Sequence, residues 1–299
     1  MNFLSIDALG IDDLRRILDH ARMPLSQIGR PLEGRGAALI FEKPSNRTRQ
    51  SMEIAVVQLG GHPVYTRGEE IGFDVRESVE DVTRVMAGYH AVLCARVFDH
   101  RVLARMAASV STPIVNLLSD TDHPLQAVAD LLTMEDEFGL LANRTVSWVG
   151  DYTNVARSLL QAAALCGMHV RLGCPAGFDA SDDELAHLLQ LGAASVEQYR
   201  DVALAVEGAD AVHTDTWISM GQEAQSGERH EIFAGFQVTA ATMSHAAPKA
   251  IFMHCLPAHR GWEVTDEVID GSQSRVIPQA HHRLSSARAV LATVMGGTS

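Results

Sequence analysis

Short apolar runs alternate with longer segments of helical periodicity along almost the whole chain. This alternation is typical of α/β proteins, in which a helix follows each strand of a parallel sheet and covers it. The expected strands are residues 36–42, 90–96, 112–118, 145–150, 169–175, 195–199, 209–215 and 250–257. The pattern therefore predicts an α/β fold with doubly wound parallel sheets.

Three expected helices are recognised by an apolar face and by the residues at their ends. Residues 49–59 stop at Gly60, and residues 124–138 begin with a proline and are followed by Gly139. Proline at the first position and glycine after the last one are the usual marks of helix ends. The stretch 282–295 also carries apolar residues at helical spacing.

The length of the chain, 299 residues, suggests two domains that each bury a core. We expect a first α/β domain at residues 1–132 and a second at residues 133–282, where a new series of strands follows. The C-terminal helix, residues 283–299, is expected to return to the first domain and pack on it.

The composition argues against two classes of protein. A net charge of −13 argues against a general nucleic-acid binder, which needs a basic face. No apolar run approaches the roughly 20 residues that span a bilayer. The N-terminus lacks the pattern of a signal peptide, and the four cysteines form no CxxC pair. We therefore expect a cytoplasmic protein that binds no membrane and keeps its thiols free.

The segment PSNRTRQSME follows the first expected strand and opens a helix. Ser45, Asn46 and Thr48 are short polar side chains at a helix N-terminus, where backbone N–H groups are available. Arg47 and Arg49 add planar cationic groups. Together these groups suit an oxyanion such as phosphate. An ordinary helix cap with two solvated arginines explains the same residues equally well.

The segment HPLQAVADLL places His123 and Gln126 one turn apart at the start of a helix. An imidazole donor and a side-chain amide can hold a carbonyl oxygen and an adjacent NH2 group. On its own, however, this short motif is better explained as a helix cap with polar surface residues.

The segment GDYTNVARSLL has the strand–turn–helix form of a dinucleotide site but lacks the GxGxxG glycines. We therefore do not expect a nucleotide there. Asn154, at the start of the helix, is suited to capping the helix, to binding a ligand carboxylate, or to both.

The segment DTWISMGQE follows another strand. Asp215 lies at the carboxyl end of that strand, where open α/β sheets bind ligands, and it is followed by the turn Ser219-Met220-Gly221. The Asp215 carboxylate is suited to a substrate ammonium group. A plain surface loop is an equally good explanation.

The segment MHCLPAHRG invites two interpretations, a Cys–His nucleophile and a metal site. Strand alternation predicts that His254 and Cys255 point to opposite sides, which makes a direct pair geometrically poor. A metal site would need further ligands such as His281 and His282, and no CxxC or HExxH motif supports it. We expect neither.

Taken in order, these five segments resemble the aspartate/ornithine carbamoyltransferase family. The resemblance runs from about Leu32 to Met295 and includes Arg76-Glu77-Ser78 and the tail segment QAHHRLSSARAV. SxRTR and HPxQ mark the family as a whole, whereas DxWxSMG and HCLP mark its ornithine branch.

The resemblance implies a role for each motif. Carbamoyl phosphate would be bound by Ser45, Asn46, Arg47, Thr48, Arg96, His123, Gln126, Cys255, Leu256 and Arg283. The catalytic residues among them would be Arg47, His123, Cys255 and Arg283. The amino-acid acceptor would be bound by Asn154, Asp215, Ser219 and Met220. The family fold consists of two α/β domains with the carbamoyl-phosphate site between them.

The implied reaction is transfer of the carbamoyl group of carbamoyl phosphate to the side-chain amine of L-ornithine, giving L-citrulline and phosphate. The resemblance implies no metal and no other cofactor. It implies a homotrimer, or a multiple of trimers, with sites at subunit boundaries. Two alternatives remain open: a paralogue that carbamoylates an ornithine-like amine in specialised metabolism, and a non-catalytic relative that binds carbamoyl phosphate.

The sequence departs from the family pattern in three places. Asn46 replaces the first threonine of STRTR, and His281-His282 replace the Glu-Asn of QxENR. The loop TRGEEIGFDVRES lacks the glutamine that reaches a neighbouring subunit's site in the family, and Glu70 or Gly72 stands there instead. The loop also lacks the lysine of the aspartate branch, which argues against aspartate as the acceptor.

Overall fold

The computed structural model describes residues 1–218 and 226–296. The chain folds into two compact units. The first unit comprises Met1–Ala129 and the residues from His282 onward, and the second comprises Asp130–His281. No helix of the described residues is long and apolar enough to cross a membrane.

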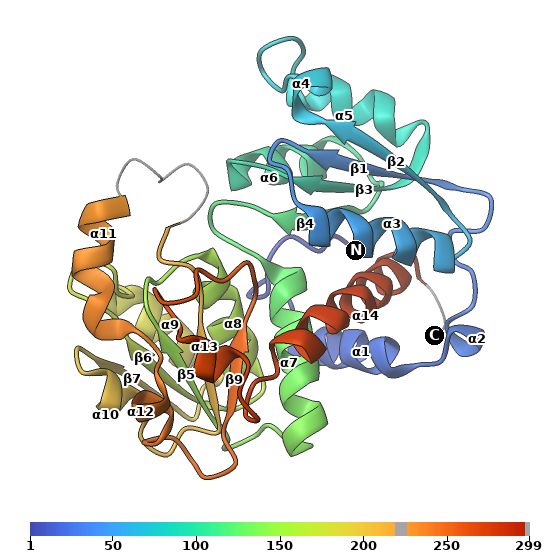
Figure 1. Ribbon diagram of the computed structural model, residues 1–299. Coiled ribbons are helices and arrows are strands. Elements are labelled where there is room, and N and C mark those ends of the chain that lie inside the picture. Colours follow the sequence, from blue (N-terminus) through green and yellow to red (C-terminus); the bar gives the residue numbers. More distant parts are fainter. Residues whose placement is uncertain (219–225, 297–299) are drawn as a thin grey trace. The chain divides into compact units, whose positions relative to one another are not determined.

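The first unit is built on a four-stranded parallel sheet with strand order β2-β1-β3-β4 (Figure 1). Its strands are β1 Gly36–Phe41, β2 His62–Arg67, β3 His90–Arg96 and β4 Ile114–Leu118. Its helices are α1 Ile11–Arg22, α2 Leu25–Ile28, α3 Asn46–Gln58, α4 Gly68–Ile71, α5 Val79–Ala87 and α6 His100–Ser109. β1 and β3 are nearly continuous apolar runs, as expected for strands that are covered on both faces. Apolar residues of α5 and α6 cover one face of the sheet.

The second unit is built on a five-stranded parallel sheet with strand order β7-β6-β5-β8-β9. Its strands are β5 Thr145–Val149, β6 His169–Gly173, β7 Ser195–Tyr199, β8 Ala211–Thr214 and β9 Ile251–His254. Its helical segments are α8 Asn154–Leu165, α9 Asp182–Leu191, α10 Val202–Val206, α11 Ser226–Phe233, the 3-10 turn η2 Ala234–Phe236, α12 Ala240–Met243 and α13 Asp266–Ile269. An apolar cluster joins one face of this sheet to α10, α12 and α13.

Two helices have residues in both units. They are α7 Pro124–Phe138, which passes from the first unit to the second, and α14 Val276–Val294, which passes from the second to the first. The first unit is therefore discontinuous in sequence.

Two parallel α/β sheets confirm the predicted fold class. Several strands are shorter than predicted; β9, for example, spans Ile251–His254 rather than 250–257. Two further details of the prediction were wrong. β2 was not predicted, because it is an edge strand whose side chains are mostly half-buried or exposed and which contains a proline. The last helix begins at Val276 rather than at residue 282, because Pro278 lies in its first turn, where proline is tolerated.

Candidate active site

Most of the predicted phosphate-binding residues lie at the carboxyl edge of the first sheet. The strand order reverses between β1 and β3, which is where open α/β sheets bind ligands. Ser45 follows β1 at the N-cap position of α3, and Arg96 ends β3. His123 follows β4 directly before α7. The fold thus brings separate motifs to one edge.

A buried hydrogen-bonded cluster joins Thr48, His123, Gln126 and Arg283, and we call it the Arg283 cluster. Arg283 Nη1 donates to Gln126 Oε1 at 2.6 Å and to His123 Nε2 at 3.1 Å. Arg283 Nη2 donates to Thr48 Oγ1 at 3.1 Å. Each of the four residues is at most 6% exposed. α14 therefore places a buried cation at the strand edge.

His123 is neutral in this environment. Burial lowers the pKa of its imidazole well below the usual value, and the positive charges of Arg283 and Arg96 lower it further. Because Arg283 donates to Nε2, the single proton of the neutral ring lies on Nδ1. His123 is therefore a hydrogen-bond donor through Nδ1 and not a cation.

The start of α3 has the features of an anion site. Ser45 occupies the N-cap position, yet its hydroxyl caps no backbone amide and donates instead to Thr48 Oγ1 at 3.0 Å. Asn46 is exposed, and its Oδ1 accepts from Gln50 Nε2 at 3.2 Å. The helix N-terminus thus keeps its N–H groups available to an oxyanion.

The two arginines of this segment differ. Arg47 is half-buried, and its guanidinium makes no hydrogen bond or ion pair among residues 1–218 and 226–296. Arg49 Nε instead donates to Glu53 Oε1 at 2.8 Å, and its guanidinium lies 3.9 Å from the centre of the Tyr65 ring. Arg47 is therefore the better ligand for an anion, and Arg49 is a surface residue.

In the second unit, a carboxylate and a thiol meet at the ends of β8 and β9. Cys255 Sγ donates to Asp215 Oδ1 at 3.0 Å, and the same oxygen accepts from the Thr216 N–H at 2.8 Å. β5 and β8 flank the point where this sheet reverses its strand order. The Asp215–Cys255 pair therefore lies at the ligand-binding edge of its sheet.

The side chains of His254 and Cys255 lie closer together than strand alternation predicts. β9 ends at His254, so strand alternation no longer applies to Cys255, and Asp215, His254 and Cys255 place one potential ligand atom each within 4.8 Å of one another. The ring nitrogens of His254 are already engaged. Nδ1 accepts from the Leu256 N–H at 2.9 Å, and Nε2 donates to buried Glu263 at 3.2 Å. His254 therefore holds the loop that contains Leu256, whose φ is 58°.

The remaining acceptor residues are placed in part. Asn154 is half-buried and is the first residue of α8. The N-cap position, for which the sequence suited Asn154, is occupied by Thr153. Ser219 and Met220 lie outside the described residues.

Sequence reasoning missed an ion pair beside Asn154. Arg229 is 6% exposed, pairs with Asp151 two residues after β5, and donates to the Trp217 carbonyl at 2.5 Å. Burial raises the pKa of the Asp151 carboxyl, and the Arg229 charge opposes that rise. Asp151 directly follows the predicted strand 145–150, and this position was the sequence signal that could have identified it as a site residue.

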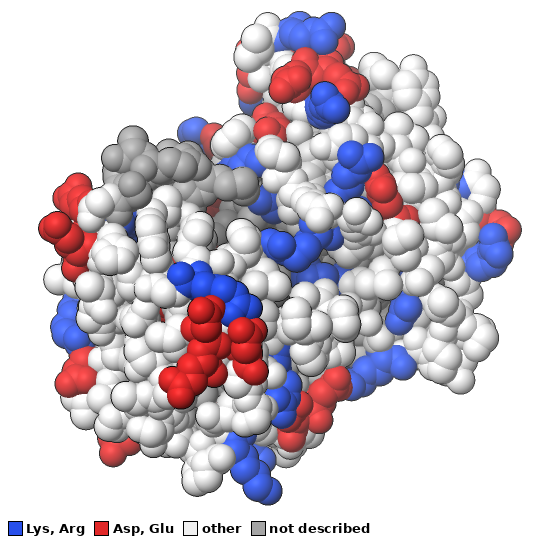
Figure 2. All heavy atoms as spheres, viewed as in Figure 1, with Lys and Arg blue, Asp and Glu red and all other residues white. Residues whose placement is uncertain are grey.

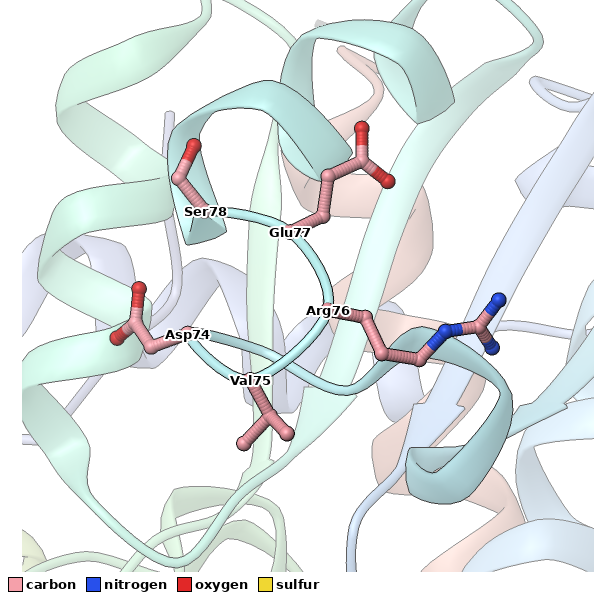
Figure 3. Close-up of a pocket in the computed structure, with 5 residues that line it drawn as sticks. All are labelled: Asp74, Val75, Arg76, Glu77 and Ser78. Carbon is pink, nitrogen blue, oxygen red and sulfur yellow. The ribbon is translucent and has the colours of Figure 1, made fainter.

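A shallow surface pocket lies elsewhere, along Asp74–Ser78 of the first unit. Figure 3 shows the side chains of this loop pointing away from one another rather than toward a shared centre. Arg76 Nη1 donates to the Glu70 carbonyl at 2.8 Å, and Arg105 binds both Asp74 and Glu80. The loop is thus held by the Arg76 hydrogen bond and by the ion pair of Asp74 with Arg105 of α6, and it does not form a convergent site.

Charged residues of both signs are interspersed on the face shown in Figure 2. That face shows no extended basic surface of the kind that nucleic acids bind. The one cation of the Arg283 cluster, Arg283, is buried, which suits a small anion rather than a large one.

Comparison with known proteins gives matches over nearly the whole chain. Residues 1–136 match the domain described as "Aspartate/ornithine carbamoyltransferase, carbamoyl-P binding domain", and residues 142–294 match the "Asp/Orn binding domain" of the same family. Ornithine carbamoyltransferase of Thermus thermophilus is 43% identical over 98% of this chain and 96% of its own length.

Solved structures match equally well. Ornithine carbamoyltransferase from Pyrococcus furiosus has a TM-score of 0.94 at 40% identity, and the match covers 100% of this chain and 98% of that one. An acetylornithine transcarbamylase complexed with acetylcitrulline has a TM-score of 0.89 at 26% identity, and that match covers 98% of this chain and 99% of the other.

Proposed function

The chain belongs to the aspartate/ornithine carbamoyltransferase family and is a carbamoyltransferase, and on this premise we propose that it converts L-ornithine and carbamoyl phosphate into L-citrulline and phosphate. The observation that carries the proposal is the Arg283 cluster, which joins three separate family motifs through buried hydrogen bonds at the carboxyl edge of the first sheet.

Carbamoyl phosphate binds to the first unit in this proposal. Its phosphate is bound by the α3 N-terminus, with Ser45, Asn46, Arg47, Thr48 and Arg96. Helix N-termini and planar guanidinium groups both favour phosphate oxygens. Its carbamoyl group is held by His123, Gln126 and Arg283, with Cys255 and the Leu256 backbone at the reacting centre.

The acceptor binds to the second unit in this proposal. Asp215 and Asn154 bind the amino acid, together with Ser219 and Met220 from the segment that follows Trp217. The Asp215 carboxylate, held by the Cys255 thiol and the Thr216 N–H, is a suitable partner for an ammonium group.

The chemistry follows from these groups. The neutral side-chain amine attacks the carbamoyl carbon, the new C–N bond forms, and the C–O bond to phosphate breaks with its electron pair going to phosphate. Negative charge builds on the carbonyl oxygen during attack, where Arg47, Thr48, the neutral His123 and Arg283 act as preorganised donors. The leaving phosphate takes the proton that the amine loses, so the residues named here need no cofactor for the transfer.

We also propose that the chain acts as a cytoplasmic homotrimer, or as a multiple of trimers. Ile54 and Val57, one turn apart on α3, are 48% and 57% exposed, and such paired apolar residues suit an interface between copies. Sedimentation-velocity measurements test this, and a monomer at assay concentration would contradict it.

The substrate test is a colorimetric assay of ureido products with ornithine, N-acetylornithine, putrescine and aspartate. Ornithine should give the highest kcat/KM, because Asp215 and Asn154 suit a free amino acid. The acetylornithine relative makes N-acetylornithine the most informative competitor. A higher kcat/KM with N-acetylornithine or putrescine would reassign the acceptor.

A further inference from the structure

Gln279 makes three hydrogen bonds from a fully buried position on α14. Its Oε1 accepts from the His254 N–H at 2.9 Å. Its Nε2 donates to Asp130 Oδ1 at 2.7 Å and to His213 Nε2 at 3.0 Å. Gln279, Asp130 and His213 are all 0% exposed. All four residues belong to the second unit.

The hydrogen bonds of Gln279 reach β8 just before Asp215 and β9 just before Cys255. His254 is the last residue of β9 and directly precedes Cys255, and His213 lies on β8 two residues before Asp215. Gln279 therefore fixes the ends of two neighbouring strands relative to each other. The Asp215–Cys255 contact of 3.0 Å lies immediately beyond those ends.

Asp130 determines which way the Gln279 amide points. A carboxylate only accepts hydrogen bonds, so the amide nitrogen must face Asp130 and the amide oxygen must face the His254 N–H. The rotated amide would place two donors or two acceptors against each other. Asp130 lies on α7 one turn after Gln126, and Gln279 lies on α14 one turn before Arg283. Hydrogen bonds from Gln279 to Asp130 and from Arg283 to Gln126 join these two helices, which cross in Figure 1.

We propose that Gln279, oriented by Asp130, is a positioning residue for the Asp215–Cys255 pair. It touches no substrate and acts by holding the two strand ends from which Asp215 and Cys255 extend. The consequence for ornithine rests on the proposed function, whereas the consequence for the Cys255 thiol does not.

The test compares Gln279→Met with Gln273→Met. Gln273 is the matched control, because its Nε2 donates to the Ala250 carbonyl at 3.0 Å, beside the opposite end of β9. Both changes remove a glutamine bond to the backbone at one end of that strand. Three quantities are measured: the rate at which Ellman's reagent modifies Cys255, which is the half-buried one of the four cysteines, the KM for ornithine and the KM for carbamoyl phosphate.

Gln279→Met should raise the Cys255 modification rate and the KM for ornithine by about five- to tenfold each, the size expected for one lost hydrogen bond. The KM for carbamoyl phosphate should stay within about twofold, because the Arg283 cluster keeps its own bonds. Gln273→Met should leave all three values near wild type. Cys255→Ser identifies the modified thiol.

Asp130→Asn provides a second variant in case Gln279→Met does not fold. An asparagine can present either oxygen or nitrogen to Gln279, so the amide loses its fixed orientation and a smaller change of the same kind should follow. If folded variants keep the wild-type thiol rate, or if Gln273→Met changes it equally, the positioning role is refuted. If the wild-type enzyme does not turn over ornithine but Gln279→Met still changes the thiol rate, the proposed substrate is refuted and the positioning role is supported.

Discussion

Arg47 and Arg49 lie two residues apart on α3 and allow a sharp test of the phosphate site. Arg47 has no hydrogen-bonding partner among residues 1–218 and 226–296, whereas Arg49 contacts Glu53 and the Tyr65 ring. If Arg47 serves the ligand and Arg49 serves the surface, alanine at each position should give opposite results. Arg47→Ala should lower the activity and leave the thermal stability unchanged. Arg49→Ala should leave the activity unchanged and lower the thermal stability.

The magnitudes follow from these contacts. Loss of one donor to the developing oxyanion lowers kcat by roughly 10²–10³-fold, and Arg47→Ala should also raise the KM for carbamoyl phosphate. Because Arg47→Ala breaks no hydrogen bond within the described chain, its free energy of unfolding should change by no more than about 0.5 kcal/mol. Arg49→Ala removes an exposed ion pair and a ring contact, so its Tm should fall by at most about 4 °C with kcat unchanged.

The assay is steady-state citrulline production over a range of carbamoyl phosphate concentrations, together with thermal unfolding of each variant. Near-normal turnover of Arg47→Ala would show that the phosphate lies elsewhere. An Arg47→Ala protein that unfolds more readily than Arg49→Ala would show that Arg47 is structural, and the reasoning from its lack of partners would fail.

Three further predictions concern pH, metal and the thiol. The folded-state pKa of His123 is depressed, so the unfolded chain binds a proton that the folded chain does not; stability should therefore fall as pH drops below about 6.5, by up to about 1.4 kcal/mol per pH unit. His123→Gln should remove this pH-dependent part of the free energy of unfolding, which urea unfolding at pH 5 and pH 7.5 measures. The same change of free energy with pH in the wild type and in His123→Gln would contradict a neutral imidazole. EDTA should leave turnover unchanged, and activity that is lost and then restored by zinc would point to a metal at Asp215, His254 and Cys255. Cys255→Ala removes the thiol donor to Asp215, so kcat/KM for ornithine should fall at least about tenfold, and wild-type kinetics would remove Cys255 from the site.

The buried strand β3 has the predicted bounds, because a short apolar run between turn residues leaves little freedom in a parallel sheet. The edge strand β7 also has the predicted bounds, although it is no apolar run and its side chains are half-buried or exposed. The edge strand β2, which carries a proline and no apolar run, was missed. The predicted residues of the Arg283 cluster are joined by hydrogen bonds in the structure, yet only the family resemblance linked Arg283 to Thr48. They are 235 positions apart in sequence, and local patterns contain no information on such contacts.

Other site features were beyond prediction for the same reason. Gln279 lies in a recognised tail motif, but its bonds to Asp130 and to the His254 backbone depend on tertiary packing. Cys255 was misplaced relative to His254, because alternation was applied one residue past the end of β9. Strand ends are where periodicity arguments fail, and they are also where α/β proteins place their ligands.

The discontinuity of the first unit has a consequence for biosynthesis. A ribosome makes Thr48, His123 and Gln126 well before Arg283, and the whole second unit is translated in between. At 5–20 residues per second, about 8–30 s separate Gln126 from Arg283. Throughout that interval the nascent chain lacks the guanidinium that these three side chains share in the finished protein. The newly made chain is therefore expected to gain its affinity for carbamoyl phosphate only late in synthesis, after the second unit has emerged.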